Sequence, residues 1–322
     1  MRPLHGALPL LLPPLLACPG CGSPGPPETP AAPAPWGDLA RAEWTDLGRI
    51  LGPADFGQAP GTIIGDPTGV LLPDGRIRLF VFVEGHGVWR ALATDASGTA
   101  FRVEGPCTLV PDPGTNTQGT PWGEPRVVAI PGGLRMFYMQ DQGIASATSA
   151  DHLTWRQEPG LRITSAQAGF RATTTGSVVP TRDGGWRMYF SERRDSPADP
   201  ATAMKSATSR DMLAWTMDSG VRVGPGAPLD QNATDPFVFA HADGSVTAWY
   251  LVQQAAGSSF HGPGGLYAAT SADGLGFPAS TRTSLPGGNP NLILRADGTP
   301  MMYLSATDPL GGPGIRAAQA KR

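Results

Sequence analysis

The chain of 322 residues is poor in charge, in cysteine and in long apolar runs. Only 16% of its residues are charged and its net charge is −3, so a basic surface for nucleic acid is not expected. Three cysteines are too few to define a disulfide framework. No Cys/His cluster has the spacing of metal ligands, and the sequence therefore predicts neither a metal nor another cofactor.

A short apolar run, "ALPLLLPPLLA", lies near the start of the chain behind Arg2. It is too short to span a membrane as a mature helix, and it predicts a signal peptide over residues 1–17. The run ends in Leu-Leu-Ala-Cys, which resembles a bacterial lipobox with Cys18 as the lipid-bearing residue. We therefore expect export to a bacterial cell envelope and a lipid anchor, the alternative being ordinary secretion with cleavage elsewhere.

Residues 18–42 are rich in proline and predict an extended linker without a core of its own. The folded domain is expected over residues 43–322. If Cys18 carries lipid, Cys21 and Cys107 remain, and an oxidising compartment would allow them to pair. Two thiols at this separation do not themselves predict a bridge.

Glycine (43 residues) and proline (35 residues) are abundant and accompany alternating apolar runs, which favours a turn-rich all-β domain. Five segments align with one another at a spacing of roughly 52 to 59 residues, which is typical of propeller repeats. They begin at Gly65, Gly123, Thr175, Thr234 and Gly288.

Each repeat contains apolar runs separated by Asp-Gly or Gly-Gly pairs, the strongest short signal for a β-hairpin. A third and a fourth strand pattern follow, which gives the four antiparallel strands of a propeller blade. The last repeat stops after its third strand, and a matching fourth-strand pattern stands at residues 43–51. The sequence thus predicts a five-bladed β-propeller whose ring is closed by an N-terminal strand.

Three repeats end in a motif that resembles the Asp-box of sialidases, with Asp151, Asp211 and Asp273 as its acids. An aspartate in such a turn accepts hydrogen bonds from nearby backbone N–H groups. The aromatic residue that follows each acid is expected to pack between blades. We interpret these residues as structural.

The first strand of each blade lines the axis of a propeller, and its start faces the channel mouth. Read round the ring, this position carries Asp66, Glu124, Gly176, Asp235 and Asn289. Carboxylates held together raise at least one pKa, which suits acid–base chemistry. The alternative is that these residues merely begin strands and cap local backbone groups.

These features together resemble the five-bladed glycosidase superfamily of arabinanases, β-xylosidases, invertases, levansucrases and mannoside phosphorylases. The resemblance implies a base or nucleophile on blade one, matched by Asp66, and a modulating acid on blade two, matched by Glu124. It implies a general acid on blade three, where Gly176 stands. Glu192, at the end of the next strand, and Asp235, on blade four, are the candidate replacements.

Side chains near the predicted mouth are candidates for binding a sugar. Trp122 and Trp89 offer aromatic surfaces, with plain packing as the alternative for Trp122. The polar candidates, for which a merely exposed position is the alternative, are Glu84, His86, Arg193, His261 and Asn289. Arg126, Arg171 and Arg193 are candidates to hold an anion, with a solvated surface position as the alternative.

The function favoured by the sequence is that of an exported glycoside hydrolase acting on a glycan. The alternative is a non-catalytic carbohydrate-binding or scaffold propeller at the cell surface. The expected partners are a glycan or oligosaccharide and a membrane reached only through the lipid anchor. We expect a monomer that does not bind nucleic acid.

Overall fold

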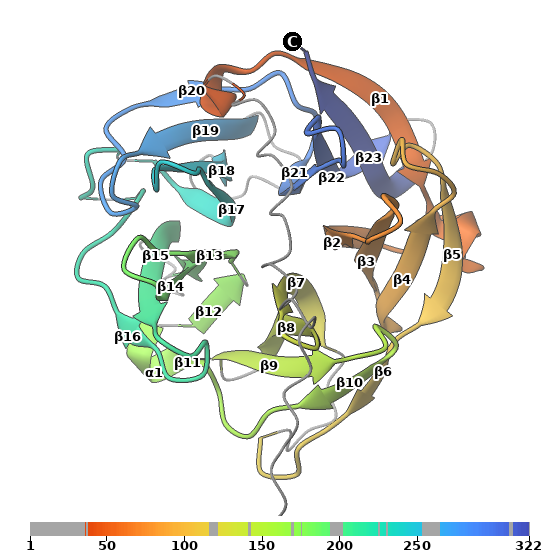
Figure 1. Ribbon diagram of the computed structural model, residues 1–322, viewed down its shortest axis with the longest axis horizontal. Coiled ribbons are helices and arrows are strands. Elements are labelled where there is room, and N and C mark those ends of the chain that lie inside the picture. The colour runs from red at the N-terminus through yellow and green to blue at the C-terminus, as the bar shows by residue number, and fades with distance from the viewer. Residues whose placement is uncertain are drawn as a thin grey trace, which may run out of the picture. The chain divides into compact units, whose positions relative to one another are not determined.

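The computed structural model describes most of the chain from Trp36 onwards. These residues are Trp36, 38–115, 122–140, 143–168, 171–174, 176–193, 202–224, 226–229, 231–252, 265–308 and 312–321. They form a ring of five small antiparallel sheets, which confirms the predicted five-bladed propeller (Figure 1). No helix among them is long and apolar enough to cross a membrane.

Each blade has an inner strand at the axis and further strands stacked outwards from it. Blade one contains β2 (Ile64–Leu71), β3 (Ile77–Val83), β4 (Gly87–Ala93) and β5 (Phe101–Pro106). Blade two contains β7 (Gly123–Ile130), β8 (Gly133–Gln140), β9 (Gly143–Ser149) and β10 (Thr154–Gln157), with β6 (Thr108–Val110) and β11 (Ile163–Thr164) added to them. A short helix, α1 (Ser165–Ala168), follows blade two.

The inner strand of blade three is split into β12 (Arg171–Thr174) and β13 (Val178–Pro180), followed by β14 (Trp186–Arg193), β15 (Thr202–Ser209) and β16 (Thr216–Met217). Blade four contains β17 (Ala233–Ala240), β18 (Val246–Val252), β19 (Gly265–Ser271) and β20 (Ser280–Arg282). Blade five contains β21 (Gly288–Leu294), β22 (Pro300–Asp308) and β23 (Gly312–Ala320).

The N-terminal strand β1 (Trp44–Leu51) completes blade five, as predicted. It pairs antiparallel with β23, so the first and last strands close the ring side by side (Figure 1). Residues before β1 also pack on the propeller. The indole of Trp36 donates a 2.6 Å hydrogen bond to the Gly298 carbonyl, and the 3₁₀ turn η1 (Leu39–Arg41) buries Leu39.

Aromatic side chains at the blade ends pack against the preceding blade. Trp155 meets Phe80 edge-on at 5.4 Å between ring centroids, and Trp215 meets Phe137 in the same way at 5.9 Å. Edge-to-face pairs of this kind add stability beyond the buried apolar area. The aromatic residues that follow the Asp-box acids are therefore core residues between blades.

The Asp-box acids hold the turns before the fourth strands. Asp151 accepts hydrogen bonds from the backbone N–H groups of Leu153 and Thr154, at 2.8 and 2.7 Å. Asp273 accepts the equivalent pair, and these backbone hydrogen bonds lower its pKa to about 2. The acids are thus occupied by local structure, as the sequence predicts.

Arg187 ties blade three to blade four. Its Nε donates to the carboxylate of Asp218 at 2.9 Å, and its Nη1 donates to the backbone carbonyl of Asp273 in the next blade at 2.9 Å. Arg135 repeats the arrangement between blades two and three. Each of these arginines therefore pairs with an acid of its own blade and donates a hydrogen bond to a turn of the next blade.

Replacing Arg187 with Met is expected to lower the free energy of unfolding by about 2 to 4 kcal/mol. The change leaves Asp218 without its cation in a largely buried pair, whose side chains are 14% and 15% exposed. Arg210→Met is the matched control, because its partner Asp183 and Arg210 itself are 65% and 71% exposed. Urea titration of both variants measures the two losses. Arg210→Met should lower the free energy of unfolding by less than about 1 kcal/mol, and a loss equal to that of Arg187→Met would contradict the structural role of Arg187.

Candidate active site

Four inner strands carry the same backbone irregularity at the channel mouth. In blade one Gly65 pairs with Phe82 and Thr68 with Phe80, so the Asp66-Pro67 pair bulges opposite a single residue. Blades two, four and five have the same register shift. The first bulged residue is left-handed in all four, with φ of 52° at Asp66, 49° at Glu124, 52° at Asp235 and 47° at Asn289.

A left-handed backbone is uncommon for residues other than glycine, although Asp and Asn tolerate it better than most. Each such position costs on the order of 1 to 3 kcal/mol unless its surroundings compensate. Bulges re-aim a side chain out of the regular alternation of the strand. The four bulges therefore turn these four side chains out of the regular strand alternation at the same mouth.

In blade three the structure corrects the position predicted for Gly176. Ser177 accepts a hydrogen bond from the backbone N–H of Val238 in the next blade, just as Thr68 accepts one from Val127 at 3.0 Å. Ser177 therefore matches Thr68. Counting back two residues places residue 175, which lies outside the described residues, at the acid position, and Gly176 at the position of Pro67.

Gly176 lies against the backbone of β14. A Cβ atom built there would overlap the carbonyl group of Tyr189, and the obstacle is backbone that cannot turn aside. The position has no room for any side chain. A glutamate placed at residue 176 would therefore not restore an acid to this blade.

Gly176→Ala is expected to destabilise the domain by about 3 kcal/mol or more, because the strands must separate to admit one methyl group. Gly132→Ala is the comparison, since a Cβ there meets nothing within 4 Å although φ is 81°. That change should cost only the backbone strain of about 1 to 2 kcal/mol. Thermal unfolding of both variants measures the difference, and equal melting temperatures would contradict the close approach.

Asp66 is buried at the mouth and held on two sides by blade five. The side-chain amide of Asn289 donates a hydrogen bond to Asp66 Oδ1, and the backbone N–H of Asp66 donates to Ser305 Oγ at 2.8 Å. Burial raises the pKa of Asp66, while the positive charge of Arg126 and the hydrogen bond from Asn289 oppose that rise. The donor from Asn289 favours the ionised form.

Asp235 is 3% exposed, and only one of its oxygens has a partner. Oδ1 accepts a hydrogen bond from the hydroxyl of Thr234 at 3.1 Å, whereas Oδ2 is buried without one. Burial, reinforced by the negative charge of Asp66, raises the pKa of Asp235 to about 7. Asp235 can therefore hold a proton near neutral pH.

Arg126 is buried among these acids, which the sequence did not require. It is 3% exposed, and its Nη1 donates to the carbonyl of Pro125 at 3.1 Å. Burial lowers the pKa of Arg126, and the negative charges of Asp66, Glu124 and Asp235 counteract that effect. Arg126 is thus an internal counter-charge, and the alternative of a solvated surface arginine is wrong. Glu124, which is half-buried, belongs to the same electrostatic cluster.

A cavity of about 280 Å³ lies along the axis beside this cluster. Its lining includes the residue two positions beyond the acid or amide position in every blade, namely Thr68, Arg126, Ser177, Phe237 and Asn291. Buried polar atoms without protein partners include Arg126 Nε and Asn291 Oδ1. A cavity of this size and polarity has room for several water molecules.

Glu192 is not brought into the cluster by any described contact. It forms an ion pair with Lys205, whose ammonium also donates to the Ala168 carbonyl at 3.0 Å. Along β14 it lies on the same side as Met188 and Phe190, which pack in the core between blades two and three. Its assignment as a general acid stays a prediction, and its present partner is a cation of its own blade.

The structure does not present Trp122 as a sugar-stacking surface. The ring is 7% exposed and packs edge-on against Tyr138 and Trp155, which corrects the substrate-binding interpretation. Trp89 lies within β4 and meets Phe56 at 5.8 Å. Trp122 belongs to the interior of the propeller, and Trp89 is half-buried.

Glu84 and His86 are exposed in the turn between β3 and β4. A carboxylate oxygen of Glu84 accepts a hydrogen bond from the backbone N–H of Ile63 at 3.3 Å. Ile63 is itself 50% exposed, so an apolar side chain lies beside exposed polar residues just before β2. These residues lie at the strand ends that carry Asp66.

Several predicted residues lie outside the part of the chain that the structure describes. These are Cys18, Cys21 and His261, together with the side chains of Arg171 and Arg193. Cys107 is described as a free thiol, and burial raises its pKa to about 12. No group of three His, Cys, Asp or Glu among the described residues is arranged to hold a metal ion.

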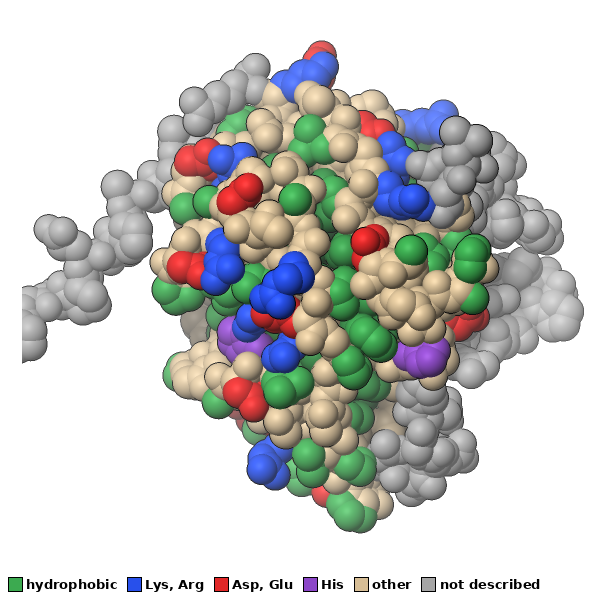
Figure 2. Space-filling view, turned by 90° about the vertical axis from the view of Figure 1, so that its right-hand side faces the viewer, with side chains coloured by type: hydrophobic (Ala, Val, Ile, Leu, Met, Phe, Trp, Pro, Cys, Tyr) green, Lys and Arg blue, Asp and Glu red, His purple; other side chains and the backbone are tan. Residues whose placement is uncertain are grey.

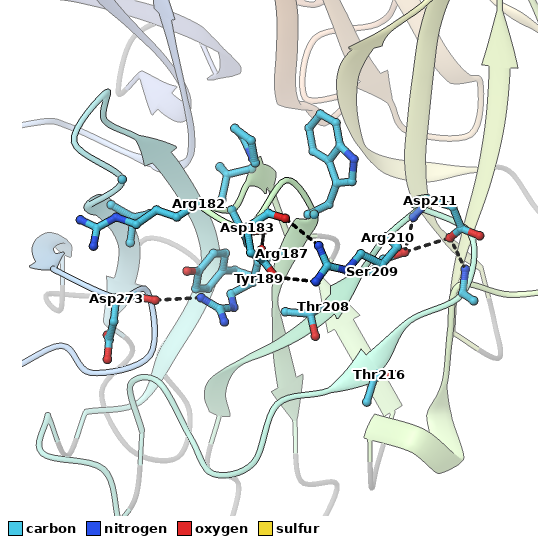
Figure 3. Close-up of a pocket in the computed structure, with 18 residues that line it drawn as sticks. Arg182, Asp183, Arg187, Tyr189, Thr208, Ser209, Arg210, Asp211, Thr216 and Asp273 are labelled. Atoms are coloured by element: carbon cyan, nitrogen blue, oxygen red, sulfur yellow. Dashed lines mark hydrogen bonds and ion pairs between the residues drawn. The ribbon is translucent and has the colours of Figure 1, made fainter.

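A larger hollow of about 570 Å³ lies between blades three and four (Figure 3) and is lined in part by the β13–β14 and β17–β18 turns. Its charged side chains form ion pairs or cap turns within the fold. Arg187 binds Asp218, Arg210 binds Asp183, and Asp211 caps its own turn. None of the side chains that line it appears among the described buried polar atoms that lack a partner.

The side of the molecule in Figure 2 shows basic and acidic side chains interleaved rather than gathered by sign. This distribution agrees with the small net charge of −3.

Comparison with known proteins supports this fold. No family model matches the chain, and no curated protein sequence matches it. A thermostable family-43 glycoside hydrolase of known structure is 18% identical, with a TM-score of 0.61 over 80% of this chain and 88% of that one. An endo-arabinase from Bacteroides thetaiotaomicron is 14% identical, with a TM-score of 0.62 over 82% and 96%.

A family 117 glycoside hydrolase from the marine bacterium Zobellia galactanivorans is 12% identical, with a TM-score of 0.61 over 86% of this chain and 90% of that one. At such identities the likeness shows the fold. The chain has the five-bladed propeller fold of these glycoside hydrolases, which confirms the resemblance stated from its motifs.

Proposed function

We propose that the protein hydrolyses a glycan at the channel mouth, with Asp66 as base or nucleophile and Asp235 as general acid. The observation that carries the proposal is the unequal pair of buried carboxyls. Asn289 donates a hydrogen bond to Asp66, whereas Asp235 keeps a bare oxygen and a pKa of about 7. Two titratable groups whose surroundings separate their roles define an acid and a base.

Hydrolysis of a glycosidic bond needs these two roles on either side of the scissile bond. Asp235 would give its proton to the departing sugar oxygen. Asp66 would either take a proton from the attacking water or attack the anomeric carbon itself. In both cases the bond to the leaving oxygen breaks and water supplies the new hydroxyl group.

The remaining mouth residues support this division. Glu124 lies in the electrostatic neighbourhood of Arg126 and would modulate the protonation of the pair. Asn289 would orient Asp66 through its hydrogen bond. Glu192 is the weaker acid candidate, because Lys205 already occupies its carboxylate.

A second function, carbohydrate binding without cleavage, is supported by the burial of the proposed acid. The Oδ2 atom of Asp235 is buried, and a sugar must therefore reach a recessed atom before it can be protonated. A propeller that only holds a glycan would not need that access.

Affinity electrophoresis and reducing-sugar release on one panel of plant and microbial polysaccharides separate the two functions. The hydrolase binds and degrades at least one polymer, whereas a binding module retards it without releasing sugar. If no polymer is retarded and none releases sugar, both proposals are wrong.

We also propose that the chain is exported and anchored through lipid on Cys18. The support is the apolar run before the Leu-Leu-Ala-Cys motif and the proline-rich stretch behind it. The mass of the mature N-terminal peptide tests this directly. An unmodified Cys18, or a chain cleaved elsewhere, would contradict it.

A further inference from the structure

The bulge of blade four has a side-chain hydroxyl immediately before its acid. In the bulges of blades one, two and five the residue before the left-handed position is a glycine, namely Gly65, Gly123 and Gly288. In blade four it is Thr234, which lies within β17 and is 4% exposed. Blade four therefore adds a hydroxyl at a point where these three other bulges have no side chain.

The Thr234 hydroxyl donates a 3.1 Å hydrogen bond to Asp235 Oδ1. Asp235 Oδ2 is buried and has no hydrogen-bond partner among the described residues. In a protonated carboxyl one oxygen carries the hydrogen and donates, and the carbonyl oxygen is the better acceptor. Because Oδ1 accepts from Thr234, it is the carbonyl oxygen of the protonated side chain, and the proton lies on Oδ2.

We propose that Thr234 is a positioning residue that fixes Oδ2 as the oxygen through which Asp235 gives its proton. The inference rests on the proposed function, in which Asp235 is the general acid, and names the group that directs its proton. In that step the Oδ2–H bond breaks and an O–H bond forms on the departing sugar oxygen. The electron pair of the glycosidic C–O bond goes to that oxygen, and Asp235 is left as a carboxylate.

The hydrogen bond from Thr234 becomes stronger as the proton leaves, because a hydroxyl binds an ionised carboxylate more tightly than a neutral acid. Thr234 therefore stabilises the charge that develops on Asp235 more than it stabilises the resting acid. An interaction that strengthens in the transition state raises kcat. Asp66 has a different arrangement, since Gly65 precedes it and its side-chain donor is Asn289 of blade five.

The test is the infrared carbonyl band of protonated Asp235, assigned by its absence from Asp235→Asn. A donor to the carbonyl oxygen lowers the frequency of this band. Thr234→Val, which keeps the branched shape but lacks the hydroxyl, should therefore raise the frequency, whereas Thr234→Ser should leave it near the wild-type value. Thr234→Gly introduces the residue that three other blades carry, should behave as Thr234→Val, and replaces it if the valine variant does not fold.

Kinetics on aryl glycosides of graded leaving-group ability give a second measurement. Thr234→Val should lower kcat about tenfold or more for poor leaving groups, which need the proton. The loss should be much smaller for a nitrophenyl glycoside, whose leaving group departs without protonation. Thr234→Ser should restore the rate on the poor leaving groups, and equal losses on both kinds of substrate would contradict a role in proton delivery.

A carbonyl band that does not move in folded Thr234→Val or Thr234→Gly would overturn the inference, and so would a wild type that lacks the protonated Asp235 band. The infrared measurement needs no turnover. If the band moves as expected but no glycoside is cleaved, the proposed function is wrong while the placement of the proton on Oδ2 by Thr234 stands. The two failures are therefore distinguishable.

Discussion

Asp66→Asn is expected to lower kcat for glycan hydrolysis by about 10³-fold or more while leaving glycan binding nearly unchanged. The amide keeps the shape of the side chain and can still pair with Asn289, but it can neither accept a proton nor attack carbon. Reducing-sugar release and affinity electrophoresis on the same polymer measure the two effects separately.

Asp74→Asn is the matched control for Asp66→Asn. Asp74 lies in the exposed hairpin turn of the same blade, where its carboxylate pairs with Arg76. The rate of this variant should equal that of the wild type within twofold. Activity that survives Asp66→Asn would show that the chemistry belongs to another group.

Asp235→Asn is expected to remove activity and, at pH 8, to stabilise the fold. The folded pKa of about 7 lies above the ordinary value of 3.8, so the folded state binds the extra proton. Stability therefore falls as the pH rises from 3.8 to about 7, and the whole cost is present above pH 7. At about 1.4 kcal/mol per pKa unit, the gain on removing the charge has an upper bound on the order of 4 kcal/mol.

Urea unfolding of wild type and Asp235→Asn at pH 4 and at pH 8 checks the sign. The variant should gain stability relative to wild type between those two values, with little difference at pH 4. Glu192→Gln should instead be destabilising, because it removes the partner of Lys205 within the fold. If Glu192→Gln alone abolished hydrolysis without loss of stability, the acid would be Glu192.

The fold could be predicted from local sequence patterns. Asp-Gly turns fix the hairpins, their repetition fixes the number of blades, and the strand that the last repeat lacks stands at residues 43–51. Because the last repeat lacks its own fourth strand, β1 pairs with β23 in its place. These features depend on neighbouring residues, for which pattern is a sufficient guide.

The site was only partly predictable, because its details depend on contacts between distant segments. The positions of Asp66, Glu124, Asp235 and Asn289 follow from their place near the start of the inner strands, although the bulge that re-aims them does not. The one-residue error at Gly176 arose because blade three splits its inner strand, which no single repeat reveals.

Besides the bulges, the burial of individual side chains could not be predicted from the sequence. Trp122 and Arg126 stand close together just before and within one strand, and both are interior, one packed on aromatics and the other held among acids. Charge in a sequence ordinarily indicates surface. Only the closing of five blades round one axis shows that Arg126 faces carboxyls from three of them.

The central claim is that the carboxyls at the mouth cut a glycan rather than only hold it. Time-resolved release of reducing ends from a polymer that the protein retains in affinity electrophoresis tests this most directly. The account predicts release by the wild type and none by Asp66→Asn or Asp235→Asn, although both variants still retain the polymer. Retention without release by the wild type itself, across the pH range from 5 to 8 that spans the pKa of about 7 for Asp235, would contradict it.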